Sequence, residues 1–170
     1  MKNKLRKQYK NIIIINKEYK DNLIIQNLKT LIKDYNKILI YYPIKNEVDI
    51  FKIIDNKKRF YLPFCINEEE MKIGLFKDKK SLIKDKCKIL SSDVFSSEKI
   101  EVAIVPSIAM NNKGYRLGYG KGYYDRYLVN SNCIKIALVY EQCLINERFE
   151  EEWDIKFDYI VTENKIIEVK

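Results

Sequence analysis

The chain has 170 residues, about the size of one ordinary domain, and with 46% hydrophobic and 33% charged residues it can form a buried core and a solvated surface. It contains no histidine, which excludes hydrolases with a histidine base, histidine-ligated zinc sites and the usual zinc deaminases. The net charge of +8 comes mostly from lysine and favours anionic ligands such as nucleotides, polycarboxylates or nucleic acid.

The first half of the chain predicts helix followed by strands. Residues 2–33 have apolar side chains at mixed spacings of three and four, which indicates helix with a break near Asn16 or Asp21. The apolar run at residues 37–43 predicts a buried strand, and the spacing over 47–55 predicts a helix. Two further strands are expected at 59–65, where Pro63 marks an edge or an end, and at 71–76.

The second half alternates strand and helix. Residues 77–100 are polar and show no clear pattern, and then residues 102–105 predict a buried strand that Pro106 stops. A short helix is expected at 123–130, a buried strand at 134–140 and a short strand at 159–162. This alternation predicts one α/β domain over residues 1–170 with a mostly parallel sheet, in which ligands bind outside the carboxyl ends of the strands.

The chain carries no sign of a membrane span or of a disulfide framework. Its longest apolar run near the start, residues 12–15, is far shorter than the ~20 residues of a spanning helix, and no secretory signal is visible. We therefore expect a cytoplasmic protein that has no membrane partner. No cysteine pair is spaced C-x-x-C, so free thiols in a reducing compartment are expected. The four cysteines are Cys65, Cys87, Cys133 and Cys143.

Glycine is concentrated in one segment, between the strand that ends at Pro106 and the helix predicted at 123. Four of the five glycines lie there, at positions 114, 118, 120 and 122, and Arg116, Lys121 and Arg126 add positive charge. Glycine allows close backbone approach, and successive N–H groups ahead of a helix bind anions, so the composition is that of a phosphate-binding loop. The segment matches neither the Walker A pattern nor G-x-G-x-x-G.

Three further charged features each have a structural and a functional interpretation. Asp125 either complements the dipole of the predicted helix or binds magnesium beside phosphates. Glu47 is read from the pattern alone as a carboxylate in the first turn of a helix, and the basic residues near the N-terminus as a solvated helix face. These basic residues are Lys2, Lys4, Arg6 and Lys7.

The segment VPSIAMNNKGYRLGYGKGYYDRYL, residues 105–128, resembles the signature of the 5-formyltetrahydrofolate cyclo-ligase family, also called methenyltetrahydrofolate synthetases. Three other segments agree in order and spacing, so the resemblance covers essentially the whole chain. They are KNKLRK, YYPIKNEVDIFKII with the following YLPF, and DIKFDYIVTE. The resemblance implies a three-layer α/β fold with helices on both faces of the sheet. It also implies conversion of 5-formyltetrahydrofolate to 5,10-methenyltetrahydrofolate with ATP and Mg²⁺, releasing ADP and phosphate.

The same resemblance implies roles for individual residues. Lys121 and Arg116 would be catalytic, with Lys121 neutralising charge on the transferring phosphoryl group, and Asp125 and Asp158 would bind Mg²⁺. The segments implied for ATP comprise Lys2, Asn3, Lys4, Leu5, Arg6, Arg116, Leu117, Gly118, Tyr119, Gly120, Lys121, Gly122, Tyr123 and Tyr124. Those implied for the folate are Tyr42, Glu47, Tyr119, Gly120, Lys121, Gly122 and Tyr123.

One region departs from the family pattern. Family members usually carry a Gly-Ile-x-x-Pro or similar stretch between the central strands, whereas residues 86–93 here contain neither glycine nor proline. We therefore expect this folate-flanking loop to differ in conformation. The expected partners are ATP and 5-formyltetrahydrofolate, with or without a polyglutamate tail, and the expected state is a monomer that binds no nucleic acid.

Two alternatives remain at this stage. A non-enzymatic module could bind RNA or another polyanion through lysine and tyrosine side chains, but it would spread those residues along one face rather than beside Asp125. A different phosphate-handling enzyme on a similar fold, such as a sugar-phosphate isomerase or an acyl-CoA transferase, would need other carboxylates and leaves residues 2–6 unexplained.

Overall fold

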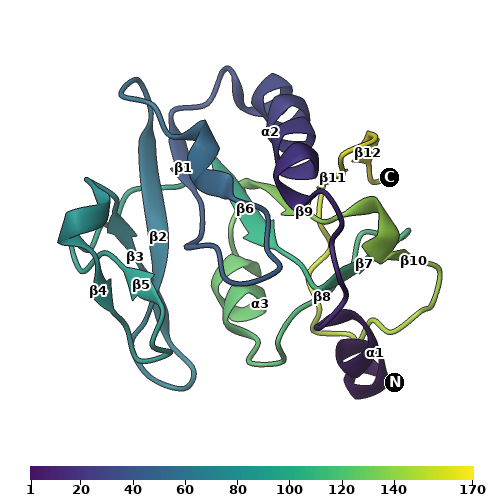
Figure 1. Ribbon diagram of the computed structural model, residues 1–170. Helices are drawn as coiled ribbons and strands as arrows, with labels where there is room; N and C mark the ends of the chain where they lie inside the picture. The colour runs from purple at the N-terminus through teal and green to yellow at the C-terminus, as the bar shows by residue number, and fades with distance from the viewer.

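The computed structural model describes residues 1–170, and a seven-stranded sheet forms its centre (Figure 1). The strand order is β12-β11-β9-β6-β1-β2-β3. Five neighbouring strands are parallel, and the two outer strands, β3 and β12, run antiparallel to their neighbours. The bounds are β1 Lys37–Leu39, β2 Arg59–Cys65, β3 Met71–Leu75, β6 Val102–Pro106, β9 Ile134–Leu138, β11 Tyr159–Val161 and β12 Ile166–Glu168.

The central strands are short runs of buried β-branched and aliphatic residues. In β6 the residues from Val102 to Val105 are fully buried, which is the pattern of a parallel strand covered on both faces. The strand predicted at 59–65 is confirmed, and Pro63 lies beyond Tyr61, the last residue of β2 that pairs with β1. The missing N–H of Pro63 therefore falls where β2 has no parallel partner.

The N-terminal helix divides at the predicted break. Helix α1 spans Lys2–Tyr9 and α2 spans Lys17–Ile32, and Asn16 precedes α2 in a left-handed conformation with φ of 54°. The helix predicted over 47–55 is reduced to one 3₁₀ turn, η1, at Ile50–Ile53. Its apolar spacing reflects the burial of Val48, Ile50 and Ile53 by a turn rather than by a longer helix.

Helices cover both faces of the sheet, as the resemblance implies. In Figure 1, α2 lies above β6 and β9, and α3, at Tyr123–Leu128, lies below them. A single buried cluster of 38 residues runs through these layers. The fold is thus α/β with a mostly parallel sheet, and no helix in it has the length and apolar character needed to cross a membrane.

Two small sheets fall in segments where the sequence predicts no strands. Strands β7 Ala109–Asn111 and β8 Arg116–Leu117 form a hairpin that pairs with β10 Leu144–Ile145. Strands β4 Ile83–Lys84 and β5 Leu90–Ser91 pair within the polar region 77–100. Two further 3₁₀ turns are η2 Lys79–Ser81 and η3 Glu141–Cys143. The β7–β8 hairpin leads directly into residues 118–122, which we call the glycine-rich loop.

Candidate active site

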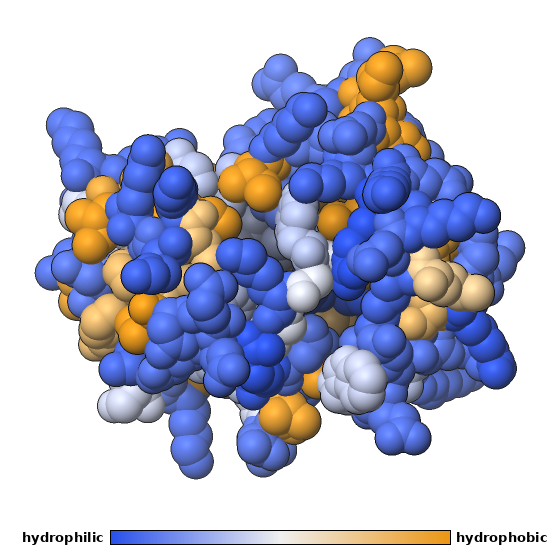
Figure 2. Space-filling model, turned by 90° about the horizontal axis from the view of Figure 1, so that it is seen from below, coloured by the Kyte–Doolittle hydropathy of each residue, from blue (hydrophilic) through white to orange (hydrophobic).

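A cleft of about 1020 Å³ opens at the carboxyl ends of the central strands. Its wall includes Pro106 at the end of β6, Pro63 and Cys65 at the end of β2, and Tyr41 and Tyr42 after β1. Figure 2, which views the molecule from below, shows a hollow between two lobes rimmed largely by hydrophilic side chains. The site therefore lies where a parallel α/β sheet is expected to bind its ligand.

The glycine-rich loop closes against the first helix. Arg6 on α1 donates a hydrogen bond from Nε to the backbone oxygen of Gly118 at 2.7 Å, and from Nη1 to Asn3 at 2.8 Å. Gly120 has φ of +94°, and a Cβ there would lie 3.1 Å from the Arg6 guanidinium carbon. Gly122, with φ of +68°, precedes α3. Glycine permits the backbone conformation at both positions and the close approach of Arg6 at Gly120.

Arg116 reaches from β8 into the cleft with an incomplete set of partners. Its Nη1 donates to the backbone oxygen of Pro106 at 3.2 Å, and its Nη2 lies 3.8 Å from an oxygen of Asp125. The guanidinium lies over the ring of Tyr124, 5.2 Å from its centroid. Its Nε is buried and has no hydrogen-bond partner. A buried, unpaired donor on a cation is a ready contact for an anionic ligand.

Two carboxylates from distant segments also meet at the cleft. Asp125 on α3 accepts a hydrogen bond from the backbone N–H of Ile155 at 3.3 Å. The preceding residue, Asp154, lines the cleft and pairs with Lys2 at 2.6 Å, with side chains only 10% and 15% exposed. Burial acts to lower the pKa of Lys2, but hydrogen bonds to Asp154 and Glu151 outweigh it, so the pKa is raised. These contacts bring oxygen and cationic groups together as in a site for a metal–phosphate ligand.

Asp158 does not reach the cleft. It precedes β11, at the amino ends of the parallel strands, and its carboxylate accepts a hydrogen bond from the backbone N–H of Lys135 at 2.7 Å. The expectation that Asp125 and Asp158 share one ion therefore does not fit the structure, because Asp125 lines the cleft and Asp158 does not. The carboxylate of the same DIKFD segment that does line the cleft is Asp154.

Glu47 lies in the cleft wall formed after β1. Its Oε2 accepts a hydrogen bond from the N–H of Ile44 at 3.0 Å. Burial raises the pKa of Glu47 to about 7, although this hydrogen bond and the charge of Arg116 act to lower it. Burial also raises the pKa of Tyr119 to about 12, and the charge of Glu47 adds to that shift. A carboxyl group with a raised pKa in a cleft is typical of a functional site.

Most of the residues singled out by the resemblance meet in this one cleft. Those that line it are Lys2, Asn3, Arg6, Tyr42, Glu47, Arg116, Gly118, Tyr119, Gly120, Lys121, Gly122, Tyr123, Tyr124 and Asp125. Three residues implied for ATP do not: Lys4 is exposed elsewhere on α1, while Leu5 and Leu117 are buried in the core. Leu5 and Leu117 therefore support, through packing, the two segments that the resemblance implies for ATP.

Sequence reasoning missed several lining residues. Asp154 opens the DIKFD segment, and the usable signal was that this segment carries two carboxylates, Asp154 and Asp158, either of which could reach the site. The group Cys65, Asp85 and Cys87 also lines the cleft. No sequence pattern marks it, since the two cysteines lie on different segments.

Comparison with known proteins agrees with this geometry. A sequence model described as the 5-formyltetrahydrofolate cyclo-ligase family matches residues 2–163. The chain belongs to this family. It is 29% identical to the 5-formyltetrahydrofolate cyclo-ligase of Mycoplasma pneumoniae over 95% of this chain and 98% of that protein. It is 32% identical to a probable 5-formyltetrahydrofolate cyclo-ligase of Schizosaccharomyces pombe over 65% of this chain and 64% of that protein.

Solved structures of the family have the same fold. The 5,10-methenyltetrahydrofolate synthetase of Aquifex aeolicus is 29% identical and superposes with a TM-score of 0.85, covering 99% of this chain and 93% of its own. The synthetase of Mycoplasma pneumoniae superposes with a TM-score of 0.72, covering 95% and 98%. Membership of the cyclo-ligase family makes the chain an enzyme and decides against the non-enzymatic binding module and the other enzyme classes.

Proposed function

We propose that the chain converts 5-formyltetrahydrofolate to 5,10-methenyltetrahydrofolate and consumes ATP and Mg²⁺ in doing so. The observation that carries the proposal is the meeting of three distant segments in one cleft: Lys2 and Arg6 of α1, the glycine-rich loop, and Glu47 after β1. The first two supply cations and backbone N–H groups for a triphosphate, and the third supplies a buried acceptor for a folate ring.

The ATP phosphates are proposed to lie between α1 and the glycine-rich loop. Arg6, held on the oxygen of Gly118, and Arg116, with its unpaired Nε, provide donors on either side of that loop. The exposed Lys121 extends from the loop, and its Nζ lies 3.9 Å from Cys87 Sγ. Because Lys121 is not held in an ion pair, we propose that it follows the transferring phosphoryl group and neutralises its charge.

Magnesium is proposed to bind at Asp125 and Asp154. Both carboxylates line the cleft, and oxygen donors beside a phosphate site suit a hard cation of this kind. When bound, Mg²⁺ supplies charge neutralisation for the phosphate oxygens. Lys2 now pairs with Asp154, and we propose that it exchanges this carboxylate for a phosphate oxygen when the nucleotide binds.

The folate is proposed to bind on the Glu47 side of the cleft. A carboxylate at this position can accept hydrogen bonds from ring N–H groups of the pterin, and Tyr42 and Tyr119, which line the same cleft, offer aromatic surfaces. Binding of a donor to the ionised form of Glu47 would oppose the burial that raises its pKa to about 7.

The proposed chemistry has two steps. The formyl oxygen takes the γ-phosphoryl group of ATP and ADP is released. N10 of the folate then attacks the activated carbon and loses its proton to solvent as phosphate leaves. No histidine base is needed, because phosphoryl transfer depends mainly on positioning and electrostatic stabilisation. The chain's contribution is to hold the formyl oxygen in line with the nucleotide while Lys121 and Arg116 stabilise the developing charge.

The test is a turnover assay with ATP, Mg²⁺ and 5-formyltetrahydrofolate. We expect methenyl absorbance in the near ultraviolet together with ADP, both dependent on Mg²⁺. ATP hydrolysis is also measured without folate, which separates a coupled ligase from a simple ATPase. Absence of both absorbance and ADP at high enzyme concentration would reject the proposal.

A further inference from the structure

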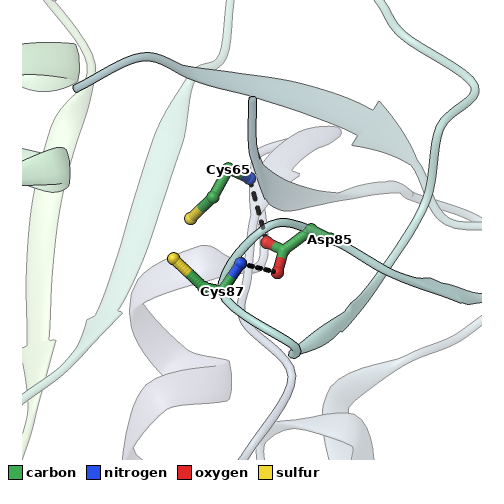
Figure 3. Close-up of side chains that lie close together, drawn as sticks. All are labelled: Cys65, Asp85 and Cys87. Carbon is green, nitrogen blue, oxygen red and sulfur yellow. Dashed lines mark hydrogen bonds between the residues drawn. The ribbon is translucent and has the colours of Figure 1, made fainter. Parts of the chain in front are cut away.

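Two cysteines from different segments meet in the wall of the cleft (Figure 3). Cys65 ends β2 and Cys87 lies in the loop between β4 and β5, and their sulfur atoms lie within 4.8 Å of each other. In Figure 3 both side chains direct their sulfur atoms into the same space. The other two cysteines, Cys133 and Cys143, are buried elsewhere in the core. Cys65 and Cys87 are therefore the pair that can react with each other.

The backbone segments that carry the two cysteines are held together by Asp85. One carboxylate oxygen accepts a hydrogen bond from the N–H of Cys65 at 2.9 Å, and the other accepts from the N–H groups of Cys87 at 2.9 Å and Ile89 at 3.1 Å. The N–H of Lys86 also donates to the oxygen of Cys65 at 3.2 Å. These bonds bring the two cysteine backbones together without a covalent link.

The same bonds argue against a metal site. The Asp85 carboxylate is already engaged by three backbone N–H donors, and Figure 3 shows it turned towards the N–H groups of the two cysteines. A dication bound by both sulfurs would also lie close to the Lys121 ammonium, whose positive charge would repel it. The arrangement suits a pair of thiols that react with each other better than a set of three ligands.

The two thiols differ in access and surroundings. Cys87 is half-buried on the cleft wall, and its sulfur lies 3.9 Å from Lys121 Nζ, whose charge can compensate the negative charge of a nucleophilic sulfur. Cys65 is buried, and burial raises the pKa of its thiol well above its usual range, with the neighbouring Cys87 and Asp85 adding to the shift. Cys87 is thus placed to react first with a reagent in the cleft and Cys65 to react second.

We propose that Cys65 and Cys87 form a reversible disulfide when the protein meets a peroxide, and that this disulfide inhibits turnover. The Cys87 thiolate attacks one oxygen of hydrogen peroxide, and with one proton gives a sulfenic acid and water. The Cys65 thiol then attacks the Cys87 sulfur, an S–S bond forms, and the hydroxyl leaves as water with the Cys65 proton. Two sulfurs are oxidised and peroxide is reduced to two waters, and a dithiol reverses the change by becoming a disulfide itself.

The inhibition follows from what Cys87 touches. Its sulfur contacts Lys121, which lies in the glycine-rich loop, and, at 3.7 Å, the hydroxyl of Tyr123, which directly follows that loop. Bond formation draws the two sulfurs from within 4.8 Å to about 2 Å, which shifts Cys87 from the position in which it makes these contacts and ties its loop to β2. This effect on turnover rests on the proposed function, whereas the disulfide itself does not.

The experiment treats the folded full-length protein with hydrogen peroxide and follows two readouts. Maleimide labelling and peptide mass mapping should show that two of the four thiols are lost and that the peptides of Cys65 and Cys87 are joined. Turnover of 5-formyltetrahydrofolate should fall in parallel and return after dithiothreitol. In Cys87→Ser, compared with its own untreated activity, the reversible loss should disappear, and in Cys65→Ser no joined peptide should form, whereas Cys133→Ser should behave as wild type.

Several outcomes would overturn the proposal. A main product with sulfinic acid on Cys87 and free Cys65, or a disulfide between two chains, would show that the pair does not close. A joined Cys65–Cys87 peptide with unchanged turnover would remove the inhibitory role. The peptide and thiol measurements need only wild-type protein, so they decide the first step even where a serine variant folds poorly or the chain lacks the proposed activity.

Discussion

Arg6 and Gly118 are 112 residues apart in the sequence, and the guanidinium of the first donates to the backbone oxygen of the second at 2.7 Å. This bond fixes the first helix against the glycine-rich loop. A hydrogen bond from a charged donor to a partly buried backbone oxygen is worth about 1.5–3 kcal/mol. The geometry of the proposed phosphate site is therefore partly set before a ligand enters.

Two glycine-to-alanine substitutions should have different effects, because one lies in the candidate site and the other in the packed sheet. A Cβ at Gly118 would lie 2.5 Å from Arg116 Nη1, and one at Gly74 would lie 1.7 Å from the backbone oxygen of Ser92. Because the Arg116 side chain can move, Gly118→Ala should displace it and lower kcat/KM by up to about 10²-fold with little change in Tm. Gly74→Ala overpacks backbone against backbone and should destabilise the fold by at least about 1–3 kcal/mol. Thermal melts and steady-state kinetics of both variants check this, and equal effects on Tm would contradict it.

Removal of the Lys121 ammonium should slow the chemical step. If the ammonium neutralises the transferring phosphoryl group, Lys121→Ala should lower kcat by roughly 10²-fold or more, the scale for losing one preorganised electrostatic donor. Tm should stay close to that of the wild type, since the side chain is exposed. Lys84→Ala, which removes an exposed lysine from β4 outside the cleft, is the matched control. Near-normal kcat in Lys121→Ala would make this residue an ordinary surface charge.

Magnesium dependence should identify the metal ligands. In Asp125→Asn and Asp154→Asn we expect a higher Mg²⁺ midpoint for turnover and partial rescue by excess Mg²⁺, because each keeps its shape but loses its charge. The double variant should be no worse than the poorer single variant, since the two residues act as one unit. Asp158→Asn should leave the Mg²⁺ midpoint unchanged because Asp158 lies at the amino ends of the parallel strands, outside the cleft. If the Mg²⁺ midpoint changed in Asp158→Asn and in neither of the other two single variants, Asp158 would be the metal ligand instead.

Glu47 should make stability depend on pH. Burial raises its pKa from 4.5 to about 7, so between these values the folded chain binds a proton that the unfolded chain has released. Stability from this group is thus fully present below pH 4.5 and is lost as pH rises towards 7. We expect the Tm of Glu47→Gln, relative to wild type, to increase from pH 5 to pH 8. Glu68→Gln, on an exposed loop, is the control, and parallel Tm curves for wild type and Glu47→Gln would contradict the shift.

The buried strands were predictable because hydrophobic runs alone define them. The strands around Val102, Ile134 and Arg59 have the expected positions, since each is an apolar run bounded by polar residues or proline. The short strands outside such runs, such as β8 at Arg116, were not predicted, because so short a segment contains no periodicity and pairing alone decides its conformation. The helix expected over 47–55 failed for a related reason, since a turn can bury the same spacing.

The site was predictable where residues are contiguous and unpredictable where the fold brings them together. The loop around Lys121 stands out through its glycines, and the structure places it in the cleft. The choice between Asp154 and Asp158 depends on whether each one lies at the carboxyl or the amino ends of the strands. The sequence of a segment that carries both carboxylates does not reveal this. The Cys65–Cys87 pair depends on a contact between β2 and a polar loop that no pattern predicts.

The contact between Lys2 and Asp154 spans 152 residues, nearly the full length of the chain. Forming a contact of such long sequence separation costs more loop-closure entropy than forming a local one, so such contacts tend to form late in folding. A growing chain can therefore assemble β1, β2 and β6 well before its proposed nucleotide site exists. In a refolding experiment, recovered turnover should lag behind the recovery of secondary structure, so catalytic competence reports the final docking of the two ends of the polypeptide.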